Sequence, residues 1–247
     1  MIRIRPIALF CAALLATGAA AHDHSQGGIQ TKPAKAVKAP FDIIHSKISL
    51  EGNVATFHMA VSGKAGKSRP AKTGKLAGSS VFSYVWPTSL DPGEVGFEAK
   101  AGILALAVTS HPDFDDTPLF DENGDGNPKN DGNLWHSHWV VLQPDNACGK
   151  DALKVVDIPP GTTPKLPKTW PGLPLLLDSP GYSPIFNGEM VEVKVPFDRA
   201  DAIAAASFDG VTAGLRVNAS MHNPLLCVVN VFKVASGNLS LPGKINQ

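Results

Sequence analysis

Apolar and polar residues alternate with a period of two over most of the chain after residue 41. This alternation is typical of half-buried strands. It predicts strands at 41–50, 54–61, 80–86, 103–109, 134–142, 153–158, 190–195, 212–218 and 225–234. The first two flank Glu51-Gly52-Asn53, which indicates a hairpin with a short turn. So many strands, with most of the 21 prolines between them, predict an all-β, mainly antiparallel domain, either a sandwich or a barrel.

Two segments depart from the period of two. An Ala-rich run inside 198–208 predicts one short helix, with Asp198 as its cap, Asp201 in its first turn and Gly210 after its end. The Pro-rich segment 159–184 predicts a long ordered loop over one end of the domain, and loops of this kind often carry function.

The N-terminus has the pattern of an export signal. Arg3 and Arg5 precede an apolar run at 7–16, and three alanines at 19–21 offer a cleavage site. We therefore expect residues 1–21 to be a signal peptide and the mature protein to be periplasmic or secreted. No other apolar run approaches about 20 residues, so no transmembrane segment is expected.

Two further regions follow the expected signal. Residues 22–40 are rich in Gln, Gly, Lys, Pro and Ala, which predicts a flexible tail. Residues 41–247 then form a single β-rich domain, a length that sandwich and barrel folds often reach undivided.

Charge and cysteine content indicate which partners and which cellular compartment to expect. Without Arg3 and Arg5 the chain keeps 20 basic against 22 acidic residues, a net charge of −2, so no nucleic-acid partner is expected. Cys148 and Cys227 remain in a compartment that favours oxidation, which predicts one disulfide. A pair of buried thiols or a copper site is the alternative.

One chemical signal is the sequence Trp135-His136-Ser137-His138-Trp139. In a strand, residues 136, 138, 140 and 142 share one face, and the two imidazoles are about 7 Å apart at Cα, close enough to bind one transition-metal ion. The candidates for a third ligand are His58 and His222, each beside a methionine that would suit copper(I). Histidines that only form hydrogen bonds within a sheet are the alternative.

Cleavage after residue 21 would create a second metal-binding arrangement. The mature chain would begin His22-Asp23-His24, with an amine, backbone amides and imidazoles that favour square-planar copper(II) or nickel(II). The same terminus could supply a copper "histidine brace", as in secreted oxidative polysaccharide enzymes. Cleavage one residue earlier would abolish both arrangements, and a solvated tail is the alternative.

An acidic loop at 121–131 has the spacing of a calcium site. It is similar to the first half of an EF-hand or dockerin loop, with a glycine at position six. Position twelve is a glycine and not the usual glutamate, although a carboxylate lies one residue earlier. The expected oxygen ligands are Asp121, Asn123, Asp125, Asn127 and Asp131. A solvated turn without an ion is the alternative.

Three functions fit these patterns. The first is an exported metal-binding β-protein, with copper as the expected metal. The second is a calcium-stabilised module that binds glycans or a protein partner, with Trp170 in the Pro-rich loop as a contact. The third is a histidine-brace copper oxidoreductase. The chain has no nucleophile elbow, phosphate loop or zinc-protease motif, so the sequence assigns no catalytic residue and leaves open whether the protein is an enzyme.

Overall fold

The computed structural model describes residues 27–71, 77–112, 116–131 and 134–247. The predicted all-β fold is confirmed, because the paired strands are antiparallel and one short α-helix is present in these ranges. The expected signal peptide, His22 and His24 lie outside the described residues. None of the described helices is both long and apolar enough to span a bilayer.

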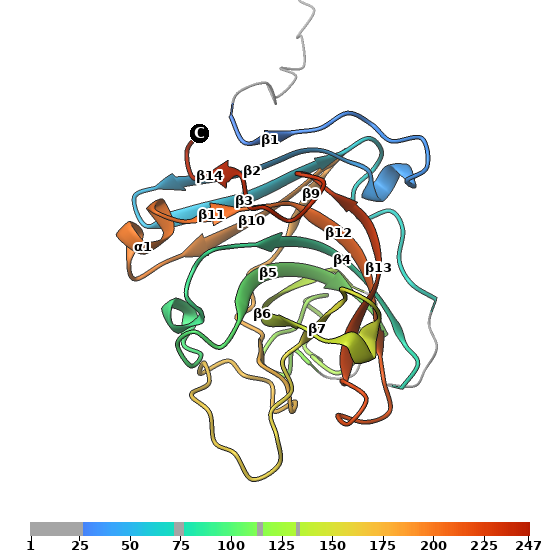
Figure 1. Cartoon of the computed structure of the whole chain (residues 1–247), viewed down its shortest axis with the longest axis vertical. Helices are drawn as coiled ribbons and strands as arrows, with labels where there is room; N and C mark the ends of the chain where they lie inside the picture. Colours follow the sequence, from blue (N-terminus) through green and yellow to red (C-terminus); the bar gives the residue numbers. More distant parts are fainter. Residues whose placement is uncertain (1–26, 72–76, 113–115, 132–133) are drawn as a thin grey trace, which may run out of the picture.

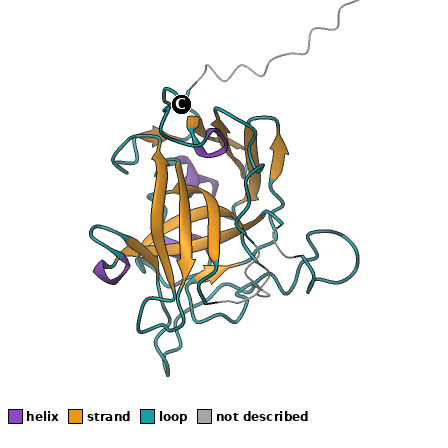
Figure 2. Ribbon diagram, turned by 90° about the vertical axis from the view of Figure 1, so that its right-hand side faces the viewer, coloured by secondary structure: helices purple, strands orange, loops and turns teal. Residues whose placement is uncertain are grey.

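The centre of the molecule is a closed six-stranded barrel (Figures 1 and 2). Its strands follow the order β5-β4-β12-β13-β7-β6, and pairing of β5 with β6 closes the ring. The bounds are β4 Ser80–Pro87, β5 Ile103–Ser110, β6 His136–Pro144, β7 Leu153–Val155, β12 Val211–Val217 and β13 Leu226–Val234. The short β8, Leu177–Asp178, pairs with β6 from the Pro-rich loop.

A second, five-stranded sheet lies over one side of the barrel, in the order β1-β2-β3-β10-β9 (Figure 1). Its two longest strands form the predicted hairpin, whose turn places Gly52 at a φ of 59°. The bounds are β1 Ile29–Gln30, β2 Ile43–Glu51, β3 Val54–Val61, β9 Ile185–Asn187 and β10 Met190–Pro196. A small ribbon joins β11, Ser207–Phe208, to β14, Gly243–Lys244.

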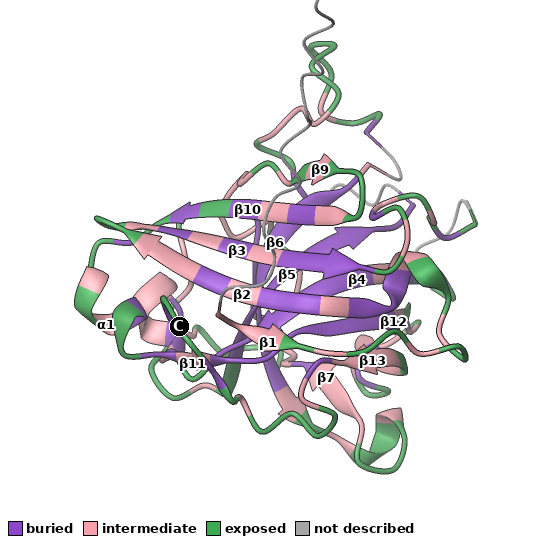
Figure 3. Cartoon of the chain, turned by 90° about the horizontal axis from the view of Figure 1, so that it is seen from above, coloured by how far each residue is buried: buried purple, intermediate pink, exposed green. Residues whose placement is uncertain are grey.

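Strand alternation gives the molecule two cores. Figure 3 shows buried positions along the strands of both sheets. On β6, Trp139 and Val141 face the five-stranded sheet and join its larger core, whereas Val140 and Leu142 face the barrel interior. The barrel core contains small residues such as Ala107 on β5 and Ala213 on β12. Positions this small leave space inside the barrel.

The helix and the N-terminal segment differ in detail from the sequence expectations. Helix α1 covers only Ala200–Ala204, and Arg199, not Asp198, is at its N-cap without a side-chain capping bond. After the helix the chain becomes extended and forms β11. Residues 29–41 are attached to the sheet through β1 and the 3-10 helix η1, Ala39–Phe41, although folding was expected to begin at residue 41. Two more 3-10 helices are η2, Pro92–Val95, and η3, Asn146–Cys148.

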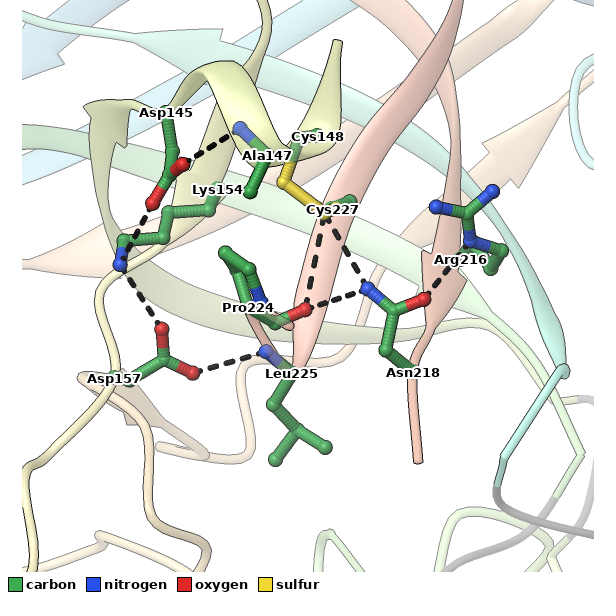
Figure 4. The surroundings of a disulfide bond; sticks show 10 residues. All are labelled: Asp145, Ala147, Cys148, Lys154, Asp157, Arg216, Asn218, Pro224, Leu225 and Cys227. Atoms are coloured by element: carbon green, nitrogen blue, oxygen red, sulfur yellow. Dashed lines mark hydrogen bonds and ion pairs between the residues drawn. A yellow bond between two sulfur atoms is a disulfide. The ribbon is translucent and has the colours of Figure 1, made fainter. Parts of the chain in front are cut away.

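The predicted disulfide joins Cys148, at the end of η3, to Cys227 in β13 (Figure 4). Beside it, the Lys154 ammonium group lies 3.0 Å from Asp145 and 3.1 Å from Asp157. The bridge closes a sequence separation of 79 residues, which stabilises the fold by roughly 3 to 5 kcal/mol in the chain-entropy model. It ties a surface loop to the wall of the barrel.

Candidate metal centre

The candidate centre is formed where β5 ends and β6 begins. The two strands are antiparallel neighbours, and their register places His136 opposite Thr109 and His138 opposite Ala107. Residues two apart along a strand point to the same side, so both imidazoles share one face, and Val140 and Leu142 on this face belong to the core of the barrel interior. His111 follows β5 directly, at the same end of the barrel.

Four buried residues converge at this end of the barrel: His111, Asp116, His136 and His138. Their ligand atoms all lie within 4.8 Å of one another. Nε2 of His111 is 2.9 Å from Nε2 of His136 and 3.0 Å from the Asp116 carboxylate. The carboxylate is also 3.4 Å from Nε2 of His138 and 3.8 Å from Nε2 of His136.

The second ring nitrogens are held by the protein. Nδ1 of His111 donates to the carbonyl oxygen of Pro112 at 2.9 Å, because a carbonyl only accepts. Nδ1 of His138 lies 3.1 Å from the Ser179 hydroxyl, whose own proton goes to the backbone carbonyl of Asp116. Ser179 therefore accepts from His138, which fixes the proton of a neutral ring on Nδ1. Outer hydrogen bonds of this kind orient histidine ligands in metal sites.

These bonds turn lone pairs toward the centre of the cluster. A neutral imidazole with its proton on Nδ1 carries a lone pair on Nε2. Nε2 of His138 is buried, has no hydrogen-bond partner among the described residues, and faces the Asp116 carboxylate. A neutral His138 would place this lone pair 3.4 Å from the carboxylate with no proton between them, and a buried polar atom without a partner is costly. A proton or a metal cation between the two groups removes this cost.

Burial and mutual charge set the protonation states. Burial alone would raise the pKa of Asp116, but His111 and His138 beside it hold that pKa well below its usual range. Burial lowers the pKa of His136 well below its usual range, against the opposing attraction of Asp116. An ionised carboxylate beside a neutral imidazole is the state in which both groups bind metal.

The dimensions suit a small four-coordinate ion. In a tetrahedral zinc site with bonds of about 2.0 to 2.1 Å, ligand atoms are about 3.3 Å apart. Four of the separations in the cluster run from 2.9 to 3.8 Å around this value, and all of them are within 4.8 Å. The geometry and the donor set therefore fit a metal ion.

The other histidines singled out in the sequence lie elsewhere. Nδ1 of His58, on β3, is 2.9 Å from the Glu192 carboxylate of β10. His222 is exposed in the turn before β13, where its backbone amide bonds to Ser220. Neither belongs to the four-residue cluster. The methionines beside them therefore give no support for copper(I) at this centre.

The acidic loop is organised by its own backbone. The Asp121 carboxylate accepts from the amides of residues 124, 125 and 126, and Asp131 accepts from those of 122 and 123. Asn123, Asp125 and Asn127 each accept a backbone amide two residues ahead. The side-chain oxygens thus bond to the loop, and calcium binding here stays a prediction.

Sequence reasoning did not identify His111 and Asp116 as ligands. A signal was present, because His111 follows one predicted strand and His136 belongs to the next. Consecutive antiparallel strands bring the end of the first beside the start of the second. Asp116 lies in the loop that connects these two strands.

Comparison with protein-family models, with curated proteins and with solved structures found no match for this chain. The functional assignment therefore rests on the geometry of the cluster.

Proposed function

We propose that this protein binds one divalent transition-metal ion through His111, Asp116, His136 and His138. The main support for this proposal is the environment of Nε2 of His138. This atom is buried, lacks a hydrogen-bond partner among the described residues and faces a carboxylate. Four protein ligands, all of them buried, would retain a bound ion. The protein is thus a metal-holding β-barrel.

The donor set favours zinc. Three imidazoles and one carboxylate suit borderline ions, and the near-tetrahedral separations match zinc better than the tetragonal preference of copper(II). Copper handling, expected from the sequence, is the competing assignment, because copper(II) binds more tightly than zinc to most nitrogen and oxygen sites. The identity of the retained metal decides between them.

We further propose that the protein works in the periplasm or outside the cell. The charged, apolar and small-residue pattern at residues 1–21 supports export. The Cys148–Cys227 disulfide is consistent with this setting, because such bonds persist in oxidising compartments.

Metal analysis of the protein purified from the periplasm without added metal tests the main proposal. We expect about one equivalent of zinc per chain, and its loss when His136 and His138 are both changed to Ala. One equivalent of copper in the same protein would instead support copper handling. A wild-type protein that holds no transition metal, and takes up none after dialysis against zinc and copper, would refute metal binding.

The two other functions have less support. A calcium-stabilised module for glycans or a protein partner depends on the acidic loop, whose oxygens are used by its own backbone. Trp170 is half-buried, with its ring nitrogen donating to the Leu175 carbonyl. The histidine brace depends on residues outside the described chain.

A further inference from the structure

A cavity of about 300 Å³ extends along the barrel interior and ends at the metal centre. Its wall is mainly apolar, with small side chains at Ser83, Ala107 and Ala213. At the opposite end of the barrel the lining includes exposed Leu239 and the loop at 150–152. The cavity therefore runs from the surface to the centre, and its volume is at the lower end for small-molecule sites.

Three of the four proposed metal ligands line the cavity: His111, Asp116 and His138. His136 does not line it, so a bound ion would have one face of its coordination shell toward the cavity. Zinc accepts a fifth ligand at such a face. A molecule in the cavity can therefore reach the metal with one donor atom.

Besides the metal ligands, the hydroxyl of Thr109 could bind a ligand at this end of the cavity. Thr109 lines the cavity beside the centre and is 7% exposed. Its hydroxyl has no hydrogen-bond partner among the described residues. A buried hydroxyl of this kind is satisfied by a ligand oxygen within reach.

The charge of the loaded centre selects the ligand. A divalent ion with one carboxylate and three neutral imidazoles carries one net positive charge, and the buried Asp178, whose pKa is raised by burial, is a further carboxyl that interacts with His138. A buried unbalanced charge is costly and favours one negative group beside it. The rest of the cavity wall is mainly apolar, apart from Ser83, Lys150 and Asp151, and favours an apolar body.

We propose that the barrel cavity binds a small monocarboxylate with an apolar chain, its carboxylate directed to the metal and Thr109. This inference rests on the proposed metal site and adds the class of ligand that the same site takes. The ligand enters from the end near Leu239, carboxylate first.

Calorimetric titration with octanoate tests this proposal, with octan-1-ol as the uncharged comparison. We expect zinc-loaded protein to bind one octanoate, and metal-free protein or octan-1-ol to give affinity at least about tenfold lower. Ala213→Leu narrows the cavity at a residue that is not a proposed metal ligand, so it should abolish octanoate binding while zinc content stays at one equivalent. Thr109→Val should weaken binding of octanoate but not of zinc.

A spectroscopic readout avoids reliance on the variants. Cobalt(II) in place of zinc reports its coordination through its visible absorption, which we expect octanoate to change and octan-1-ol to leave unaltered. Zinc-loaded protein that does not bind octanoate, or binds it equally well without metal, overturns the ligand proposal and leaves metal binding standing. A protein that holds no metal overturns both.

Discussion

The barrel and the five-stranded sheet each place histidines beside a carboxylate, but in different arrangements. At the end of the barrel, three imidazoles surround Asp116, and the protein holds the outer nitrogens of His111 and His138. On the sheet, the rings of His45 and His58 have centroids 5.4 Å apart, and His58 pairs with Glu192 at 2.9 Å. Only the first arrangement converges on one point.

The difference comes from what holds the second nitrogen of each ring. On the sheet, Nε2 of His45 bonds to the Gly27 carbonyl and Nδ1 of His58 to Glu192, so these nitrogens are used in separate pairs. In the barrel, Ser179 and Pro112 take the outer nitrogens and leave Nε2 directed inward. Histidine content alone therefore does not identify a metal site.

The largest effect should come from removing one ligand. His138→Ala leaves three of the four donors and exposes the ionised Asp116 to an empty space, so zinc affinity should fall by more than about 100-fold. Competition with a chromophoric chelator measures this change. His58→Ala on the sheet is the matched control and should leave zinc affinity unaltered; equal losses in the two variants would contradict the assignment.

Metal loading should stabilise the fold by the next largest amount. An ion that binds only the native state at 100 times its dissociation constant adds about 2.7 kcal/mol, which raises Tm by roughly 5 to 11 °C for a chain of this size. Thermal unfolding with zinc and with a chelator measures the shift. The double variant His136→Ala/His138→Ala should show no shift, and one that persisted there would place the stabilising ion elsewhere.

A smaller effect should follow from removing the hydroxyl that orients His138. Ser179→Ala leaves all four ligands but frees the ring, and zinc affinity should fall by about 10- to 100-fold. Ser137→Ala is the matched control, since this buried hydroxyl bonds to the Tyr182 carbonyl on the opposite face of the same strand. Weaker zinc binding in the control alone would show that Ser179 does not position the ligand.

Much of the fold could be predicted because strand alternation is a local property. Nine predicted strands correspond to strands in the structure, including the hairpin of β2 and β3. The helix ended early because the chain after Ala204 turns to form β11 against β14, a contact distant in sequence. Closure of the barrel through β5 and β6 is likewise a long-range pairing that local patterns do not specify.

The site was predicted only where its residues share one strand. The spacing of His136 and His138 gave both their common face and their proximity. His58 was a reasonable third candidate by composition, but β3 belongs to the other sheet and its ring faces Glu192. Finding His111 and Asp116 required knowing which strand lies beside β6, and that depends on tertiary pairing.

The smallest effect should come from the sheet pair itself. Glu192→Gln removes a charge that is 34% exposed, and a pair so open to solvent contributes at most about 1 kcal/mol. The variant should therefore unfold within about 1 kcal/mol of the wild type in urea, and zinc should add the same stability to both proteins. A zinc response that disappeared with Glu192→Gln would mean that His58 and Glu192 hold the ion. The distinction between the four-residue barrel cluster and the His58–Glu192 pair would then no longer hold.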